Sequence, residues 1–327
     1  MRAYCAWNNE GVCANRLIWL IIGAMIVVFT IGGWCLGICL DLRSAWKAIL
    51  AIVCCLAISW FYRWLRPDPW IAFGARALAQ LAIILSLGVL LTYVAAATNF
   101  PYRDGDFHAI DQWLGLDSVT YLRFFNERPH LYRVIAASYA SIRLQTVLVV
   151  GALVAASKFE RLQTYVIAVA AALAITLAAF IVLPAGNIYT GLNISPTNFP
   201  NLSLSGAFDH VAPLAAARNH TGYTIDFGAL AGLISFPSFH TASAVMFSWA
   251  VFPLRKLRSW VFALNVLMVA GTPVDGGHYF IDLAGGLATA CIAVFSAVWL
   301  QRACGLVVCS GNAPSGQGHD MDGPIIS

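Results

Sequence analysis

Long apolar segments separated by short polar ones run along most of the chain. Eight of these segments approach the length of about 20 residues that a helix needs to cross a bilayer. The pattern therefore predicts an all-α, polytopic membrane helix bundle with about eight transmembrane helices. The predicted spans are Leu17–Leu40, Trp46–Leu65, Ala77–Ala97, Leu144–Ser157, Tyr165–Leu183, Phe239–Leu254, Trp260–Pro273 and Ile281–Leu300. The fourth, sixth and seventh are short, and we expect them to extend into flanking amphipathic residues.

Composition supports this interpretation. Hydrophobic residues make up 60% of the 327 residues and charged residues only 10%, whereas soluble domains average about 25% charged residues. One soluble core cannot account for that deficit, so the bilayer is the expected surrounding. The net charge of +4 is too small and too scattered to indicate nucleic-acid binding.

The charged residues predict an orientation through the positive-inside rule. With both termini on the cytoplasmic side, eleven of the 19 cations and only five of the 15 acidic residues fall on the inner side. The basic turn Arg255–Arg258 between the sixth and seventh spans is the clearest inner marker. The sequence therefore predicts cytoplasmic termini in a plasma membrane, and short loops are compatible with a bacterial inner membrane.

Three regions are expected. Residues 1–76 would hold an N-terminal tail and two additional transmembrane helices, and residues 77–302 a six-helix core. Two long outer loops belong to this core: residues 98–143, which suit either interfacial helices or a packed cap, and residues 184–234. A loop as long as the second is usually functional or disordered. Residues 303–327 are polar and glycine-rich, which predicts a disordered tail.

Two short motifs carry ionisable residues to the ends of predicted spans. The first is Ser235-Phe-Pro-Ser-Phe-His240, and the second is His278-Tyr-Phe-Ile-Asp282. Ionisable groups at such positions are functional candidates by default. His278 and Asp282 are four residues apart, so a helix places them on one face, where the carboxylate can orient the imidazole.

The spacing of the motifs predicts that they meet. The 38 residues from His240 to His278 suffice for one helix inward, the turn at Arg255–Arg258 and one helix back, at about 1.5 Å per residue. Both histidines then return to the same face of the membrane. We expect this to be the non-cytoplasmic face.

The first motif also suits an anion. Ser235 can cap the helix, Pro237 suits its first turn, and Ser238 offers a hydroxyl group. The amides of Ser238, Phe239 and His240 would point at an anion bound at the positive end of the helix. Phosphoryl transfer needs positioned donors, and two histidines can divide the work of attack on phosphorus and protonation of the leaving group.

Together, Phe-Pro-Ser-Phe-His240 and Gly-Gly-His278-Tyr-Phe-Ile-Asp282-Leu-Ala-Gly-Gly286 resemble the type 2 phosphatidic acid phosphatase superfamily. Within it they are most similar to the inositol phosphorylceramide synthase-like (inositolphosphotransferase-like) branch. The resemblance covers roughly Ala77–Leu300. It implies that His278 is the nucleophile of a phosphohistidine intermediate, that Asp282 orients it, and that His240 is the general acid and base.

The resemblance further implies a phosphate held by backbone amides and basic residues without a metal or cofactor, so Ser238 and Phe239 are the expected phosphate ligands. The superfamily's usual arginines are absent, because its Lys and Arg-Pro pair is not apparent near the fifth predicted span and Gly271-Thr272 replaces Ser-Arg. In addition, Pro-Ser-Phe-His replaces Pro-Ser-Gly-His, as in the inositolphosphotransferase-like branch. Arg218, just before the first motif, is the best substitute. Asp275 is expected either to bind an acceptor hydroxyl or to cap the next helix.

Three functions compete. The first is a lipid phosphotransferase or phosphatase, with a phospholipid or lipid phosphate as substrate and a lipid alcohol or water as acceptor. The second is a metal-dependent hydrolase in which His240, His278 and Asp282 form a facial triad. The third is a transporter or a non-catalytic lipid-binding protein. Transporters place polar residues at mid-bilayer, whereas the ionisable residues here gather at one face, which favours the first function.

Overall fold

The structure is a computed structural model that describes residues 11–204, 208–219 and 223–311. Eight helices form the bundle, and they begin and end close to the predicted spans. They are α2 (Gly11–Leu36), α3 (Trp46–Trp64), α4 (Pro69–Ala97), α8 (Ile142–Ala155), α9 (Phe159–Val182), α13 (Phe239–Val251), α14 (Arg258–Asp275) and α15 (Phe280–Gly311).

Five of these helices, α2, α3, α4, α9 and α15, are long and apolar enough to cross a membrane on their own. A sixth span results if α7 (Pro129–Ala140) and α8, which are bent by 56°, count as one. The eight predicted helices therefore all form, but α13 and α14 fall short of an independent span by length and composition. The protein is an integral membrane protein with an all-α bundle.

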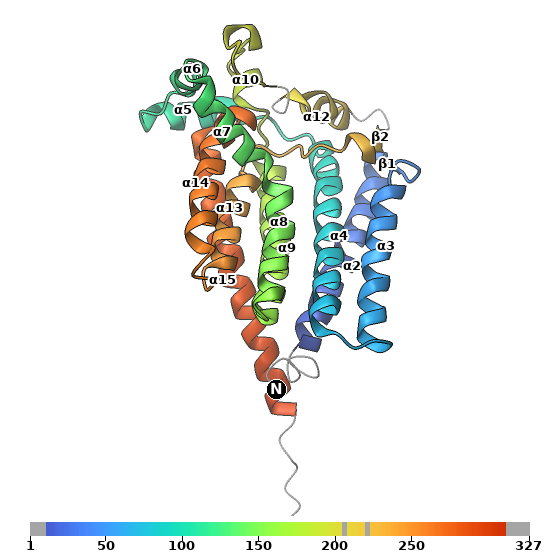
Figure 1. Cartoon of the computed structure of the whole chain (residues 1–327). Helices are drawn as coiled ribbons and strands as arrows, with labels where there is room; N and C mark the ends of the chain where they lie inside the picture. The colour runs from blue at the N-terminus through green and yellow to red at the C-terminus, as the bar shows by residue number, and fades with distance from the viewer. Residues whose placement is uncertain (1–10, 205–207, 220–222, 312–327) are drawn as a thin grey trace, which may run out of the picture.

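Smaller elements gather at one end of the bundle, where Figure 1 shows them as a cap. The first described residue of α2 and the last of α15 lie at the opposite end (Figure 1). The smaller elements are α5 (Asp104–Trp113), α6 (Ser118–Asn126), α7, α10 (Ile188–Gly191), α12 (Val211–Arg218), the 3-10 helices η2 (Pro196–Asn198) and η3 (Phe227–Ala229), and strands β1 (Ile38–Asp41) and β2 (Tyr223–Asp226).

Two boundaries differ from the predicted ones. The first span was expected to reach Leu40, but α2 ends at Leu36, because Gly37 adopts φ = 69° and the chain continues into β1. Strand β1 then pairs in parallel with β2, a contact between distant segments that local apolar patterning does not reveal. The predicted tail begins at residue 303, whereas α15 continues to Gly311, and residues 312–327 lie outside the described part.

Helix α9 occupies the centre of the bundle. It packs against α4, α13 and α15, and 56% of its most apolar stretch of 18 residues is buried. Small residues on α15, namely Ala290, Ala293 and Ala297, are completely buried and allow close helix packing. In contrast, only 6% of the most apolar 18-residue stretch of α3 is buried, so α3 lies at the edge of the bundle.

The two long loops form a packed cap, one of the two alternatives that the sequence left open. Phe107, Leu122 and Tyr132 from the first loop share one buried apolar cluster with Tyr189 and Phe199 from the second. Burying such side chains stabilises a fold by about 1.5–3 kcal/mol each relative to exposure. The cap therefore holds the residues that precede both motifs in fixed positions.

Candidate active site

Helix α13 begins at the first motif. Its N-cap is Ser238, whose Oγ accepts a hydrogen bond from the amide of Thr241 at 3.3 Å. The amide of Ser238 donates to the backbone carbonyl of Asp282 at 3.0 Å. The hydroxyl and the amide of Ser238, which we expected to bind phosphate, thus both form hydrogen bonds within the protein. The phosphate contact of Ser238 stays a prediction. The peptide bond between Phe236 and Pro237 is cis.

Asp282 lies at the centre of the second motif and is completely buried. Its Oδ2 accepts three hydrogen bonds: from Nδ1 of His278 at 3.1 Å, from the amide of Tyr279 at 3.0 Å and from Oγ of Ser235 at 2.8 Å. A carboxylate only accepts hydrogen bonds, so Nδ1 of His278 must be the protonated nitrogen. The lone pair of Nε2 is therefore free for chemistry.

Ser235 and Ser238 divide their roles differently from our expectation. We predicted that Ser235 caps α13, but Ser238 is the cap, and Ser235 instead donates to Asp282. Ser235 lies three residues before the cap, where the chain still runs alongside the start of α15. The first motif therefore helps to hold the carboxylate of the second.

Two glycines just after the second motif make this contact possible. A Cβ on Gly286 would fall on the carbonyl oxygen of Ser238 and lie 2.8 Å from Cβ of Thr241. A Cβ on Gly285 would lie 2.7 Å from Cε2 of Phe236 and 3.0 Å from Cβ of Pro237. Because real Cβ atoms essentially never approach other atoms this closely, α15 can meet the start of α13 only with glycine at both positions.

A second carboxylate fixes the start of α15 from the cap. Asp111 on α5 is completely buried and accepts hydrogen bonds from the amides of Phe280 and Ile281, at 2.7 and 2.9 Å. These amides are orphan donors of the helix N-terminus, so Asp111 satisfies them and complements the helix dipole. Burial raises the pKa of Asp111, and the two amide hydrogen bonds oppose that shift.

Asp104 makes a parallel connection. Its Oδ1 accepts from the hydroxyl of Tyr279 at 3.0 Å, and its carboxylate accepts from the amide of Gly186 at 3.0 Å through Oδ2. Burial raises the pKa of Asp104, and these hydrogen bonds oppose the shift. Asp104 thereby ties both long loops to the residue that follows His278.

The two histidines approach each other, as their spacing predicted. The ring of Tyr139, at the end of α7, stacks on the ring of His240 with centroids 4.0 Å apart and planes 14° apart. The hydroxyl of Tyr139 and Cδ2 of His278 flank the same point beside Gly276, 2.7 and 2.6 Å from where its Cβ would be. His240 and His278 also interact electrostatically. Tyr139 therefore bridges the two motifs.

Asp275 does not take the capping role, one of its two expected roles. The start of α15 is held by Asp111 and Asp282, so Asp275 does not cap it. Its Oδ1 accepts from the hydroxyl of Tyr132 at 3.0 Å. Its Oδ2 is buried without a hydrogen-bond partner among the described residues, and its binding of an acceptor hydroxyl stays a prediction.

Arg218 contacts the cap. Its Nη2 donates to the carbonyl of Phe100 at 2.6 Å, and its guanidinium lies 4.0 Å from the ring centroid of Tyr102. Neither contact involves a residue of the two motifs. The phosphate contact that we predicted for Arg218 is therefore a prediction without a supporting contact.

A different arginine acts on the first motif. Arg143, in the first turn of α8, interacts electrostatically with His240. It forms no ion pair with any carboxylate in the described part of the chain. The amides of Phe239 and His240 likewise have no acceptor among the described residues. An anion beside His240 would meet these donors and this charge.

Sequence reasoning missed Tyr139, Arg143 and Asp111, all in the segment that we treated as an outer loop. Nothing within residues 98–143 marks these three as partners of motifs more than 90 residues away. The available signal was charge: Arg143 opens an otherwise apolar predicted span, which is itself a sign of function.

The site has no metal-binding geometry among the described residues, where no group of three His, Cys, Asp or Glu side chains is placed to hold a metal ion. Nδ1 of His278 and Oδ2 of Asp282 face each other at 3.1 Å instead of facing a common centre. The arrangement supports a histidine whose Nε2 is a nucleophile and whose Nδ1 is held by a carboxylate.

Comparison with known proteins gives one match. A sequence model of the PAP2 superfamily matches residues 105–296, more than half of the chain, including both motifs. No curated protein and no solved structure matches significantly. Helices α2, α3 and α4 lie outside the matched residues.

Proposed function

Because the chain belongs to the PAP2 superfamily, we propose that it is a membrane-embedded lipid phosphotransferase that works through a phosphohistidine. The observation that carries this proposal is the 3.1 Å contact between Nδ1 of His278 and Oδ2 of the buried Asp282. It leaves Nε2 of His278 free and raises the basicity of the ring. PAP2 membership supports a lipid phosphate or phosphodiester as the donor.

The reaction has two steps. Nε2 of His278 attacks phosphorus while the ester bond to the lipid breaks, and protonated His240 gives its proton to the leaving oxygen. An acceptor hydroxyl then gives its proton to His240 and attacks phosphorus, which breaks the phosphorus–nitrogen bond and restores both histidines. Asp282 keeps its hydrogen bond from Nδ1 of His278 and stabilises the charged His278 ring. The free amides of Phe239 and His240 bind the developing phosphoryl charge.

Phe239 favours an alcohol acceptor. It stands where the superfamily's usual motif has glycine, and in this the motif resembles that of the inositolphosphotransferase-like branch. Water as the acceptor would make the protein a lipid phosphate phosphatase, which is the alternative outcome of the test. The acceptor's hydroxyl would approach from the side of Tyr139 and Asp275, where Oδ2 of Asp275 has no described partner.

The test uses purified protein in detergent with chelator present and labelled lipid phosphates and phosphoinositides as donors. Ceramide or diacylglycerol is added or omitted as the acceptor. A new lipid product that forms only with acceptor supports the transferase. Free phosphate or a free phosphorylated headgroup without acceptor identifies a hydrolase. No turnover of any donor would contradict both forms of the proposal.

We further propose that both termini are cytoplasmic and that the site faces the non-cytoplasmic side of a plasma membrane, consistent with a bacterial inner membrane. The basic turn that includes Lys256 supports this orientation. Thr197→Cys in a background without native cysteines should react with an impermeant thiol reagent on intact cells. Lys256→Cys, in the turn between α13 and α14, should react only after permeabilisation. The reverse pattern would contradict the orientation.

A further inference from the structure

A pocket of about 650 Å³ lies beside the first motif, between α3, α4, α8, α9 and α13. Its volume lies within the range of about 300–1,000 Å³ that is typical of ligand sites. The catalytic histidines do not line it. It reaches the motif through Phe239, the residue before His240, and through Ser243, one helical turn further on.

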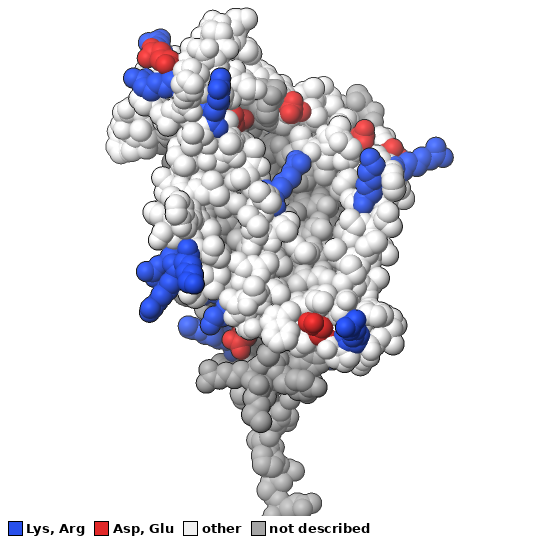
Figure 2. Space-filling view, viewed as in Figure 1, with Lys and Arg blue, Asp and Glu red and all other residues white. Residues whose placement is uncertain are grey.

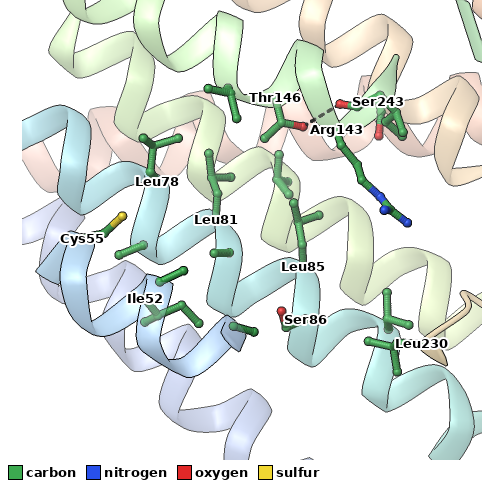
Figure 3. A pocket seen from close by; sticks show the side chains of 18 of the residues that line it. Ile52, Cys55, Leu78, Leu81, Leu85, Ser86, Arg143, Thr146, Leu230 and Ser243 are labelled. Carbon is green, nitrogen blue, oxygen red and sulfur yellow. Dashed lines mark hydrogen bonds between the residues drawn. The ribbon is translucent and has the colours of Figure 1, made fainter. Parts of the chain in front are cut away.

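The lining is divided by polarity along the pocket. Figure 3 shows Arg143, Thr146 and Ser243 towards one end, near Leu230, and Ile52, Cys55 and Leu78 towards the other. Arg143 lies in the first turn of α8 and Leu78 in the first half of α4, so the polar end of the pocket is at the capped end of the bundle. A molecule with a charged head and an apolar tail would therefore fit with its head beside His240 and its tail along the bundle.

Arg143 gives the polar end its charge. The residue is exposed and has no carboxylate partner among the described residues, and its charge acts on His240. Figure 2 shows that the middle of this face of the bundle is largely uncharged, with most of the charged side chains towards its two ends. An unpaired guanidinium beside an apolar pocket is complementary to a phosphate ester on a lipid.

Half of this pocket lies outside the family match. Ala48, Ile52 and Cys55 of α3 and several residues of α4 form one wall, whereas α8, α9 and α13 within residues 105–296 form the other. The wall that does not belong to the matched region is thus supplied by the N-terminal helices. The sequence suggested no role for α3, whereas the structure shows that it forms part of the pocket wall.

We propose that this pocket binds the acyl chain of the lipid phosphate substrate, with Arg143 on the phosphate and with α3 and α4 determining which chains fit. The inference rests on the proposed function only for the reaction of the bound lipid. Binding of the lipid in the pocket does not depend on it. Since α3 lies at the edge of the bundle, the chain can enter sideways from the bilayer. Arg143 then replaces the arginines that the superfamily's usual motifs would supply.

The binding test uses phosphatidic acid with a photoreactive diazirine on one acyl chain, added to the full-length protein in nanodiscs. Crosslinks should concentrate in residues 48–55 and 78–89. Excess unlabelled phosphatidic acid should remove them, whereas diacylglycerol of the same chains, which lacks the phosphate, should compete at least about tenfold less well. Crosslinks spread evenly around the bundle, or equal competition by both lipids, would overturn the proposal.

Variants separate tail from head. Ile52→Trp should fill the pocket and reduce crosslinking, and should lower kcat/KM for long-chain phosphatidic acid about tenfold or more but not for a short-chain soluble phosphate ester. The matched control Val53→Trp, on the exposed side of the same helix and outside the pocket, should change neither. If Ile52→Trp does not fold, Ser86→Phe on α4 replaces it. Equal effects on long and short substrates would overturn the assignment of the tail.

Arg143→Gln should abolish the preference for phosphatidic acid over diacylglycerol in the competition and raise KM for long and short phosphate esters about tenfold or more. Arg143→Lys should recover part of it. Arg133→Gln, an exposed arginine ten residues earlier, is the control and should have no effect. Localised crosslinks without any turnover would refute the proposed function alone, whereas turnover without localised crosslinks would refute the pocket alone.

Discussion

The ring of Tyr139 stacks on the ring of His240 at 4.0 Å, and its hydroxyl reaches the surroundings of His278. The aromatic side chain thus fixes the plane of the His240 ring and the distance between the two motifs. Stacked aromatic pairs contribute about 0.5–1.5 kcal/mol beyond their buried area.

We expect Tyr139→Phe to keep nearly full activity and Tyr139→Leu to lower kcat by about tenfold, because leucine removes the stack and lets His240 rotate. The measurement is kcat and KM on a lipid phosphate in detergent. Equal losses in the two variants would instead assign the role of Tyr139 to its hydroxyl.

Ser235 is the second position that the structure singles out. Ser235→Ala removes one of the three hydrogen bonds to Oδ2 of Asp282, and a hydrogen bond to a charged group contributes about 1.5–3 kcal/mol. We expect kcat to fall about tenfold or more while KM changes little, since this hydroxyl is buried and already donates to Asp282.

Steady-state kinetics with Ser195→Ala, an exposed serine of the second loop, provide the control for Ser235→Ala. A rise in KM with unchanged kcat would show that Ser235 acts on substrate binding and not on the carboxylate.

Gly286 tests the close contact between α13 and α15. Gly286→Ala places a methyl group on the carbonyl of Ser238, so the helices must separate and the Asp282 network must loosen. We expect a melting temperature lower by several degrees and a loss of most activity. Gly23→Ala on α2 meets nothing within 4 Å and should be neutral or slightly stabilising. A neutral Gly286→Ala would contradict the packing.

Asp117 provides a pH-dependent test of the cap. It is the N-cap of α6 and accepts from the amides of Val119 and Thr120, and these bonds, with one from the hydroxyl of Thr120, lower its pKa below 3.8. A lowered folded-state pKa stabilises the protein above the unfolded value, and this contribution is lost as the pH falls through the folded pKa. Asp117→Ala should therefore cost about 1 kcal/mol at pH 7.

The cost of Asp117→Ala should shrink as the pH falls below about 4. Thermal unfolding of the detergent-solubilised protein at a series of pH values measures this, with Asp106→Ala as a control because Asp106 caps no helix. The same loss at pH 3 and pH 7 would contradict the role of Asp117 as a charged cap.

Sequence alone predicted the elements whose signal is local. Long apolar runs predicted the eight helices, and the spacing from His240 to His278 predicted that two crossings would return the motifs to one face. The sequence also predicted the contact between His278 and Asp282, but from a shared helix face, whereas His278 lies two residues before α15 begins and meets the carboxylate from outside the helix. What the sequence did not predict depends on distant segments: Tyr139 on His240, Asp111 on α15, and β1 on β2.

Arg218 and Arg143 illustrate the same limit. We chose Arg218 because it is near the first motif in the sequence, yet it lies on Phe100 and Tyr102. Arg143, which lies 97 residues before His240, interacts electrostatically with that histidine because α8 packs against α13. Proximity along the chain was a poor guide once a long loop intervened.

The central claim is that His278 becomes phosphorylated, and trapping the intermediate tests it most directly. Wild type, His278→Ala and His240→Ala would be mixed with a ³²P-labelled lipid phosphate carrying a good leaving group, then quenched in alkali, in which phosphohistidine survives. We expect label in the wild type. Label should accumulate slowly in His240→Ala, because the good leaving group of this substrate departs without an acid. His278→Ala should carry none. Label on His278→Ala, or wild-type turnover retained by that variant, would contradict the account.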